Sequence, residues 1–275
     1  MADELAAFAH DLLKGRKALV TGGGTGLGKA IATGLARAGA DVVIAARRED
    51  VLAEAAADIE KATKQRVETD LVDIRDPETV TALADRHRDT TLLVNNAGGQ
   101  FPQKMRDYSP NGWRTVVDLN LNGTWNMTQA FGEQMLTRNG GVICQIVATT
   151  GRGIPGIGHS ASARAAVIEM TKTLSFEWGP KVRLNCVAPG QFRTDAYENT
   201  YEEGVGDTFV EYPLPFPGHV DDIANAVVFM SSPASRYITG QVLYCDGGLI
   251  NRGLMSALPP GDDSYPERQE PSPGW

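Results

Sequence analysis

The sequence predicts a doubly wound α/β fold, a single domain with one parallel sheet. Apolar strand patterns alternate with helical patterns along the chain, as they do in βαβ units. Between residues 141 and 190, an apolar strand, a loop rich in Gly and Pro, a helix of small residues and a second strand follow one another. Open α/β sheets bind ligands beyond the carboxyl ends of their strands. We therefore expect the polar residues after the first of these strands to face a reaction centre.

The same patterns place the elements in chain order. A short amphipathic helix is expected at 2–14. Strands are expected at 16–20, 41–46, 67–71, 92–94 and 241–245, with two more inside 141–190. Helices are expected after the glycine turn (closed by Gly39), up to about Lys64, from Pro77 onward, and over 112–138, 160–178 and 220–231. Residues 1–258 form the catalytic domain in this interpretation. The aperiodic stretch 191–218 is a lid, and the Pro-rich polar tail 259–275 is extended or disordered.

Composition narrows the classes of partner. The chain has 275 residues, a net charge of −8 and three cysteines. A negative balance argues against nucleic acid, because phosphate binding needs a basic surface. No apolar run approaches the roughly 20 residues that span a bilayer, and the acidic start lacks the basic region of a secretory signal. Cys144, Cys186 and Cys245 lie in predicted strands without metal-site spacing, so we expect reduced core cysteines, no metal and a cytoplasmic protein.

Gly22, Gly26 and Gly28 lie in the predicted turn between the first strand and the first helix. Glycine there permits a positive φ and lets a pyrophosphate approach the backbone at a helix N-terminus. The spacing T-G-x-x-x-G-x-G differs from the usual G-x-G-x-x-G template. Its strand–turn–helix setting nevertheless favours dinucleotide binding over a plain tight turn.

Arg47 and Arg48 follow the second strand, with Glu49 only after them. NAD-binding domains place an acidic residue there for the ribose 2′-hydroxyl, whereas an arginine accommodates a 2′-phosphate. Guanidinium groups hold phosphate through charge-assisted, bidentate hydrogen bonds. The sequence thus favours NADP(H) over NAD(H); the alternative is a pair of solvated arginines before a helix.

Together with further motifs, these residues resemble the short-chain dehydrogenase/reductase family over 17–248. The matching motifs are TGGGTGLG, Asp73 after the third strand, NNAG at 95–98, Asn120 in LNLNG, and VAPGQFRT at 187–194. The resemblance implies a Rossmann-type fold and a nicotinamide cofactor. VTGGGTGLGKA, DIRDPETV, NNAGGQF, SPNGW, LNGT and HSASARAAV are similar to the 2,4-dienoyl-CoA and trans-2-enoyl-CoA reductase branch. That branch reduces conjugated carbon–carbon double bonds of acyl-CoA thioesters with NADPH.

The resemblance also implies roles for individual residues. The pyrophosphate of the cofactor would be held by Gly22, Thr25, Gly26, Leu27 and Gly28, and its 2′-phosphate by Arg47 and Arg48. The adenine would be bordered by Asp73 and Ile74, and the ribose next to nicotinamide by Asn95, Ala97 and Gly98. The carboxamide would be lined by Pro189, Gly190, Phe192 and Thr194. Asn120 would organise a proton-relay water; the alternative is an Asn bonded to a neighbouring carbonyl. A homotetramer or homodimer is implied, with the 112–138 and 160–178 helices packing across subunits.

The active-site positions depart from the family's serine and Tyr-x-x-x-Lys. Ser160 stands at the tyrosine position and Arg164 at the lysine position, and Thr149 or Thr150 would replace the serine. Arg164 lies one helical turn from Ser160 and can bind ribose hydroxyls, but a guanidinium does not give up its proton. Ser160 is too weak an acid to be a tuned proton donor. His159 could titrate near neutral pH, although a loop or cap histidine is the alternative.

This missing phenol favours one reaction over another. Reducing a ketone makes an alkoxide that needs a proton at once, whereas reducing a conjugated thioester builds an enolate that needs hydrogen bonds to oxygen. Ser160, Thr149 or Thr150, and Gln100 could provide those, and Arg75 could assist a phosphate. We therefore expect an NADPH-dependent enoyl-thioester reductase that binds no nucleic acid and no membrane.

Two other functions stay open. One is an NADP(H)-dependent alcohol or ketone oxidoreductase in which His159 or a lid tyrosine (Tyr197, Tyr201 or Tyr212) acts as acid and base. The other is a nucleotide-binding protein that has lost hydride chemistry, since sites diverge within one fold.

Overall fold

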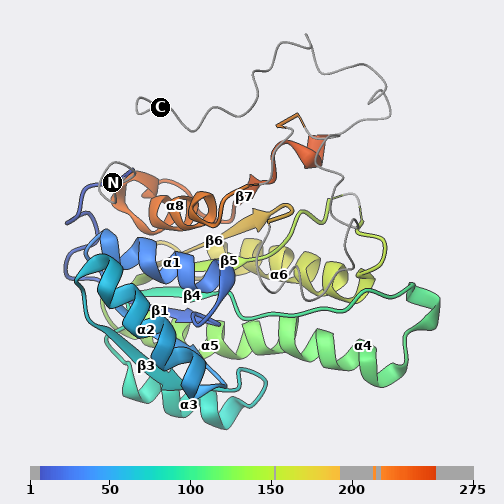
Figure 1. Cartoon of the computed structure of the whole chain (residues 1–275), viewed down its shortest axis with the longest axis horizontal. Coiled ribbons are helices and arrows are strands. Elements are labelled where there is room, and N and C mark those ends of the chain that lie inside the picture. The colour runs from blue at the N-terminus through green and yellow to red at the C-terminus, as the bar shows by residue number, and fades with distance from the viewer. Residues whose placement is uncertain (1–6, 152, 193–212, 215–217, 252–275) are drawn as a thin grey trace.

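Seven parallel strands form the centre of the molecule, in the order β3-β2-β1-β4-β5-β6-β7 (Figure 1). The computed structural model describes residues 7–151, 153–192, 213–214 and 218–251. The strands are β1 Lys17–Thr21, β2 Asp41–Ala46, β3 Val67–Leu71, β4 Leu92–Asn95, β5 Gly141–Ile146, β6 Val182–Pro189 and β7 Val242–Cys245. The strand order reverses between β1 and β4, and ligands bind at such a switch point in doubly wound folds. The predicted fold class is confirmed.

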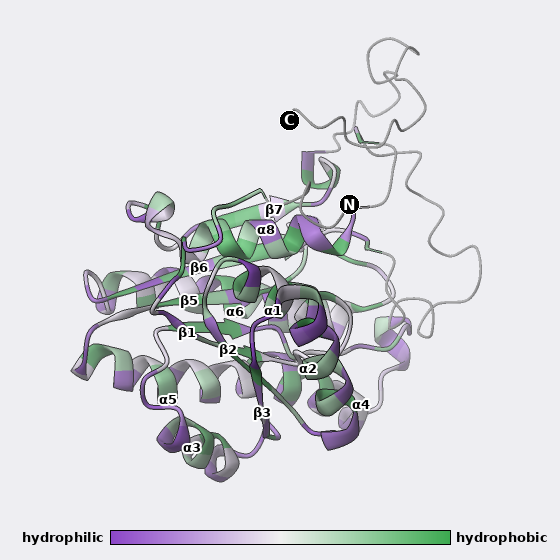
Figure 2. Ribbon diagram, turned by 60° about the vertical axis from the view of Figure 1, so that its left-hand side comes forward, coloured by the Kyte–Doolittle hydropathy of each residue, from purple (hydrophilic) through white to green (hydrophobic). Residues whose placement is uncertain are grey.

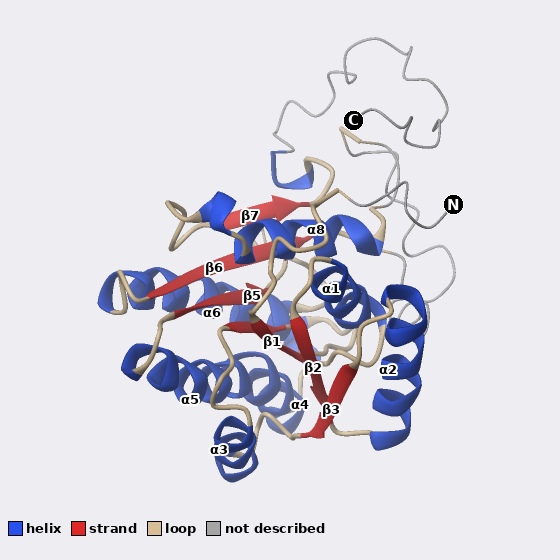
Figure 3. Ribbon diagram, turned by 90° about the vertical axis from the view of Figure 1, so that its left-hand side faces the viewer, coloured by secondary structure: helices blue, strands red, loops and turns tan. Residues whose placement is uncertain are grey.

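Helices cover both faces of the sheet (Figure 3). They are α1 Gly26–Arg37, α2 Glu49–Thr63, α3 Pro77–Arg86, α4 Pro110–Val117, α5 Gly123–Thr137, α6 Gly158–Glu177 and α8 Val220–Ser231. Side chains of α1, α2 and α8 make one core, and those of α3, α5 and α6 contribute to the other. In β1, Val20 belongs to the first core and Leu19 to the second, because successive side chains point to opposite faces. Green strands therefore lie between helices whose outer faces carry purple residues (Figure 2).

The long helix predicted over 112–138 contains an irregular segment. It begins at Pro110, where the Ser109 side chain accepts a hydrogen bond from the Gly112 N–H. A π-helical segment, η2 Asp118–Asn122, joins α4 to α5. Such wide turns are frequent at functional sites, and this one contains the buried Asn120.

Some predicted segments differ from the structure or lie outside its described residues. Of the helix expected at 2–14, residues 10–15 form turns, and a buried Leu13 anchors them to the first core. Residues 1–6, most of the expected lid and the tail beyond residue 251 lie outside the described residues.

The three cysteines lie in β5, β6 and β7, as predicted, and are unpaired. Burial raises the pKa of the Cys144 thiol, and that of Cys186 and Cys245 to about 11. They are therefore thiols at neutral pH. Within the described chain no group of three potential metal ligands gathers, and no helix has the length and apolar character to cross a membrane.

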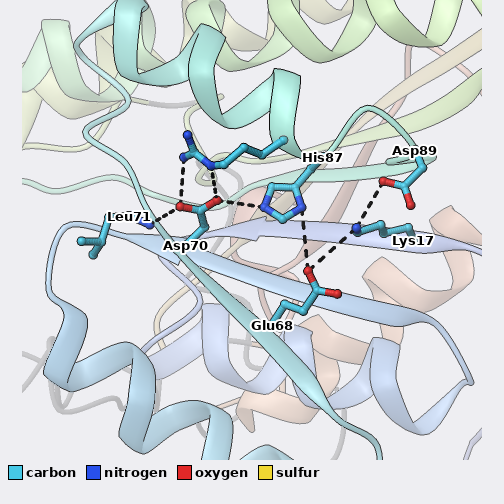
Figure 4. A network of polar contacts seen from close by, with 7 residues as sticks. Lys17, Glu68, Asp70, Leu71, His87 and Asp89 are labelled. Carbon is cyan, nitrogen blue, oxygen red and sulfur yellow. Dashed lines mark hydrogen bonds and ion pairs between the residues drawn. The ribbon is translucent and has the colours of Figure 1, made fainter.

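A polar network joins β3 to the C-terminal end of α3 (Figure 4). We call it the β3–α3 network; its members are Lys17, Glu68, Asp70, Arg86, His87 and Asp89. Asp70 accepts hydrogen bonds from Arg86 Nε at 2.8 Å and Nη2 at 3.0 Å, and its Oδ2 lies 2.9 Å from His87 Nε2. Lys17 Nζ lies 3.2 Å from Asp89 Oδ1. Each cation here is paired with a carboxylate.

Candidate active site

A cavity of about 920 Å³ lies beyond the carboxyl ends of β1, β2, β4, β5 and β6. Most residues predicted to bind cofactor line it: Gly22, Thr25, Gly26, Leu27, Gly28, Arg47, Arg48, Asp73, Ile74, Ala97, Gly98, Arg164, Pro189, Gly190 and Phe192. Among the other predicted site residues, Gln100 and Thr149 also line the cavity. Thr194 and the three lid tyrosines lie outside the described residues.

The glycine turn after β1 forms a tight cradle. Gly22 and Gly26 have φ of +66° and +49°, a region that favours glycine. A Cβ on Gly28 would overlap the carbonyl oxygen of Gly22, so this close approach requires glycine. Thr25 caps α1 without a side-chain hydrogen bond, which leaves the N–H groups of the first turn to another partner. This geometry fits a pyrophosphate.

Sequence reasoning missed Thr21, the residue that joins this turn to the next loop. Its Oγ1 accepts hydrogen bonds from the backbone N–H groups of Asn96 and Ala97, both at 3.0 Å. The Asn96 side chain donates in turn to the carbonyl oxygen of Thr21, also at 3.0 Å. The feature of the sequence that could have identified Thr21 is its place directly before the first glycine of the turn.

Arg47 and Arg48 are exposed at the end of β2, where they line the cavity. The carboxylate nearby, Asp73, accepts hydrogen bonds from the Arg75 side chain, one of them from Nε to Oδ1 at 2.9 Å. Arg75, with a smaller contribution from Arg47, holds the pKa of Asp73 at about 2. Because Arg75 neutralises Asp73, the surroundings of Arg47 stay favourable for an anion.

One cofactor prediction, Asn95, is not supported by its position. Its side chain is 3% exposed and points into the core, where Nδ2 donates to Thr128 Oγ1 at 3.0 Å and to Gln145 Oε1 at 2.9 Å. The following residue, Asn96, lines the cavity. Strand alternation turns consecutive residues to opposite sides, so the NNAG motif contributes one buried and one cavity-facing asparagine.

Ser160 is the centre of a hydrogen-bonded group that we call the active-site network: Gln100, Asn120, Ser160 and Arg164. Its Oγ accepts from Asn120 Nδ2 at 3.1 Å and from Arg164 Nε at 3.3 Å. A hydroxyl has two lone pairs and one hydrogen, so its remaining bond must be a donated one. The acceptor is Gln100 Oε1 at 2.9 Å. Ser160 itself is 1% exposed and does not line the cavity; Gln100 does.

Asn120 uses both ends of its amide to fix the loop after β4. Its Oδ1 accepts from the Gly99 N–H, and its Nδ2 donates to the Gly99 carbonyl, both at 2.9 Å. The second Nδ2 hydrogen goes to Ser160. The side chain therefore holds Gly99 and Ser160 together, and its predicted role toward a relay water stays a prediction.

Arg164 is partly buried without a carboxylate partner among the described residues. Its Nη1 donates to the carbonyl oxygens of Ile146 at 2.7 Å and Val147 at 3.3 Å. Burial lowers its pKa to about 10, which leaves it charged at neutral pH. A Cβ on Gly98 would lie 2.6 Å from Arg164 Nη2, so this glycine lets the loop after β4 pass close to the cation.

The two threonines after β5 differ in position. Thr149 lines the cavity. Its Oγ1 lies 3.3 Å from the Pro189 carbonyl oxygen and 3.3 Å from Asp246 Oδ2, and both oxygens are acceptors within reach of its single hydrogen. Asp246 also accepts from the N–H groups of Gly248 and Ile250 at 2.9 Å, so Thr149 braces this wall. Thr150 does not line the cavity.

His159 is fully buried in the first turn of α6 and does not line the cavity. Its ring stacks on Tyr108, with centroids 4.4 Å apart, and Tyr108 Oη lies 3.3 Å from His159 Nδ1. Sequence reasoning missed Tyr108, because nothing in the local pattern shows that a residue 51 positions away reaches His159.

Comparison with known proteins agrees with this geometry. The sequence profile of the family described as enoyl-(acyl carrier protein) reductase matches residues 22–250. The peroxisomal 2,4-dienoyl-CoA reductase of Danio rerio is 38% identical over 88% of this chain and 83% of its own.

Two solved structures are also similar. A short-chain dehydrogenase/reductase family protein has a TM-score of 0.80 and 34% identity, covering 87% of this chain and 99% of its own. A gluconate 5-dehydrogenase from Burkholderia cenocepacia J2315, in complex with NADP and tartrate, has a TM-score of 0.82 and 31% identity over 88% and 98% of the two chains. The chain thus belongs to the short-chain dehydrogenase/reductase family and is an NAD(P)-dependent oxidoreductase.

Proposed function

We propose that this enzyme uses NADPH to reduce a conjugated carbon–carbon double bond of an acyl-CoA-like thioester. The observation that carries the proposal is the hydrogen bonding of Ser160. This residue takes the position of the family tyrosine, is buried, and gives its one hydrogen to Gln100. The network therefore offers hydrogen-bond donors to a substrate oxygen and no phenolic acid at that position.

Gln100 is the residue that would contact the substrate oxygen. Its Oε1 accepts from Ser160, so both amide hydrogens lie on Nε2, and one of them would be donated to the substrate oxygen. A donor fixed in advance stabilises the negative oxygen of an enolate without giving up a proton. Asn120 and Arg164 hold Ser160, and Ser160 holds Gln100. The orientation of the amide thus follows from the whole network.

Arg47 and Arg48 support NADPH as the cofactor. Both are exposed at the cavity, and Arg75 neutralises Asp73, a carboxylate that also lines it. The glycine cradle would hold the pyrophosphate, and Arg164 the ribose hydroxyls. A bound nicotinamide would supply the hydride for the distal alkene carbon, and a proton from water would then go to the carbon of the resulting enolate, which completes the reduction.

The apolar lining of the cavity supports an acyl substrate. Pro102, Leu119, Ile154, Ile157 and Ile250 are among the residues that line the cavity. Apolar lining with a few fixed polar groups is typical of small-molecule sites. An acyl chain can pack against these side chains while its thioester oxygen reaches the Gln100 amide.

The test is NADPH oxidation with crotonyl-CoA, hexadienoyl-CoA and simple ketones. We expect turnover of the conjugated thioesters, with a loss of about 100-fold in kcat for Gln100→Ala, as for other oxyanion donors. Ser160→Ala should also lower kcat, because Gln100 loses its partner. Ser162→Ala is the matched control on the exposed face of α6 and should change nothing. Oxidation of NADPH by ketones alone would overturn the substrate assignment.

A second candidate is an alcohol or ketone oxidoreductase. It is favoured by the similarity to the gluconate 5-dehydrogenase, and it needs an acid other than Ser160. His159 is buried away from the cavity, so this function would rest on Tyr197, Tyr201 or Tyr212. Loss of ketone turnover in one of their Phe variants would support it. NADPH binding without turnover of any substrate would instead indicate a silent homologue.

A further inference from the structure

Two loops line the cavity, and contacts behind them hold the loops together. The loop after β4 carries Gln100, and the loop before α6 leads to Ser160. The Gln103 N–H donates to the Gly156 carbonyl at 2.7 Å, and Tyr108 Oη donates to the same carbonyl at 3.3 Å. The Gly156 carbonyl is thus a shared acceptor for the loop after β4.

His159 lies between the same two loops. Phe101, the neighbour of Gln100, packs edge-on against its ring, with centroids 4.5 Å apart and an interplanar angle of 89°. Tyr108 stacks on the ring at 4.4 Å and 21°. The residue after Gln100 therefore touches the residue before Ser160. The ring contact between Phe101 and His159 thus joins the backbone segments that carry Gln100 and Ser160.

The hydrogen bonds of His159 fix its tautomer. Its Nδ1 accepts from the Ser160 N–H at 2.8 Å, and Tyr108 Oη is 3.3 Å away. The Ser160 N–H belongs to the first turn of α6, whose N–H groups have no carbonyl partner within the helix. With Nδ1 as the acceptor of this bond, the ring proton belongs on Nε2, which is buried and has no hydrogen-bond partner among the described residues. Burial lowers the pKa of His159, which keeps the ring neutral.

We propose that Tyr108 and His159 form a positioning pair that holds Gln100 in register with Ser160. Neither side chain lines the cavity. The pair acts by fixing the backbone of Ser160 and the loop that carries Gln100, so its effect on turnover rests on the proposed function. Because the tautomer of His159 is a property of the resting protein, the pair can also be examined without a substrate.

Three variants separate the contributions of the pair. His159→Asn keeps an acceptor near the position of Nδ1 but loses the ring. His159→Phe keeps the ring and loses the acceptor. Tyr108→Phe keeps the stack and loses the hydroxyl. Tyr237→Phe is the matched control, since Tyr237 is fully exposed on the surface.

Steady-state kinetics with hexadienoyl-CoA give the first readout. We expect kcat to fall about 10- to 100-fold in His159→Phe and less in His159→Asn and Tyr108→Phe, as expected for a lost hydrogen bond. The KM for NADPH should stay within about twofold, because the cofactor cradle is untouched, and the control should match the wild type. Equal losses in His159→Asn and His159→Phe, or a rise in the KM for NADPH as large as the fall in kcat, would indicate general damage and overturn the proposal.

The second readout is the imidazole ¹⁵N spectrum of the resting protein. The chain has four histidines, and the signal missing from His159→Asn identifies His159. We expect a neutral ring with the proton on Nε2 at pH 7, and a change of its signals in Tyr108→Phe. A charged ring, or a proton on Nδ1, would overturn the pair whatever the substrate is. If the wild type reduces only ketones, the proposed function fails, and the same kinetics with a ketone still test the pair.

Discussion

The two polar networks of this protein treat their cations differently. In the β3–α3 network, Arg86 and Lys17 each face a carboxylate, at 2.8 Å and 3.2 Å. In the active-site network, Arg164 bonds only to carbonyl oxygens and a hydroxyl among the described residues. A buried cation without a carboxylate costs folding free energy. The first arrangement stabilises the fold, and the second keeps a cation available for a ligand.

The strongest test of this contrast is Arg164→Met. We expect kcat/KM to fall about 100-fold or more, because Ser160 loses a donor and the cofactor loses a cation. The midpoint of thermal unfolding should stay the same or rise, since removing this cation strands no carboxylate. Steady-state kinetics and a thermal melt of the same sample measure both. Unfolding at a clearly lower temperature would mean that Arg164 stabilises the fold as Arg86 does.

The arginines at the end of β2 provide the next largest effect. In Arg47→Ala with Arg48→Ala, the KM for NADPH should rise about 10- to 100-fold, the value of one or two charge-assisted hydrogen bonds. The KM for NADH should change little, because NADH lacks the 2′-phosphate. A parallel loss for both cofactors would show that these arginines do not contact the phosphate.

Asp70→Ala is the counterpart in the β3–α3 network. The variant leaves Arg86 and His87 without their shared acceptor, and we expect unfolding to become easier by about 1–3 kcal/mol. Kinetic constants should not change, since none of the side chains of this network lines the cavity. Asp85→Ala removes the exposed pair with Arg88 and should cost less than about 1 kcal/mol. Denaturant titration compares them, and equal costs would contradict the difference in burial.

His159 predicts a dependence on pH. Burial lowers its pKa, so the folded enzyme should keep a neutral ring down to a pH below the ordinary histidine value of about 6.5. The aromatic side chains packed against the ring are Phe101 and Tyr108, and no charged group contributes to the shift. At more acidic pH, protonation of Nδ1 removes the acceptor of the Ser160 N–H, and kcat should fall. His159→Asn has no titratable ring, so its kcat should not show this fall at acidic pH. A pH profile of kcat that is the same as that of the wild type would show that another group causes the fall.

The smallest effect concerns Asp73. Its pKa is about 2 in the folded protein and about 3.9 when unfolded, so its contribution to stability is complete above pH 4 and disappears as the pH falls through 2. Arg75→Gln should therefore lower the midpoint of thermal unfolding slightly at pH 5, and the difference from wild type should shrink toward pH 2. A difference that is constant with pH would show that the ion pair with Asp73 does not cause it.

Features encoded by local pattern could be predicted from the sequence. Strands β1, β2, β4 and β5 are mostly apolar, as a parallel sheet buried on both faces requires, whereas the edge strand β3 (VETDL) is largely polar and exposed. The glycine cradle was predictable because positive φ at Gly22 and Gly26 restricts the residue type. The expected helix at 2–14 was wrong over its described residues, 7–14, where packing of Leu13 against the first core prevails over amphipathic periodicity.

Features that depend on contacts between residues distant in sequence could not be predicted from the sequence. The partner of Ser160 lies 60 residues away, and that of His159 lies 51 residues away. Asn95 and Asn96 are adjacent and identical in type, and only the end of β4 decides which of them is buried. Gln100 was identified from its place after NNAG, but the orientation of its amide follows only from the donors that surround Ser160.

The π-helical segment at Asp118–Asn122 has a consequence for how this helix can change. Such a wide turn accommodates one residue more than a regular α-helix would over the same rise. Deleting one residue here would restore an unbroken α-helix and rotate everything on one side of the deletion by about 100° relative to the other. Either Asn120 would swing away from Gly99, or Met127 and Phe131 would leave the sheet. Helix length in this region is thus fixed jointly by chemistry at one end and packing at the other.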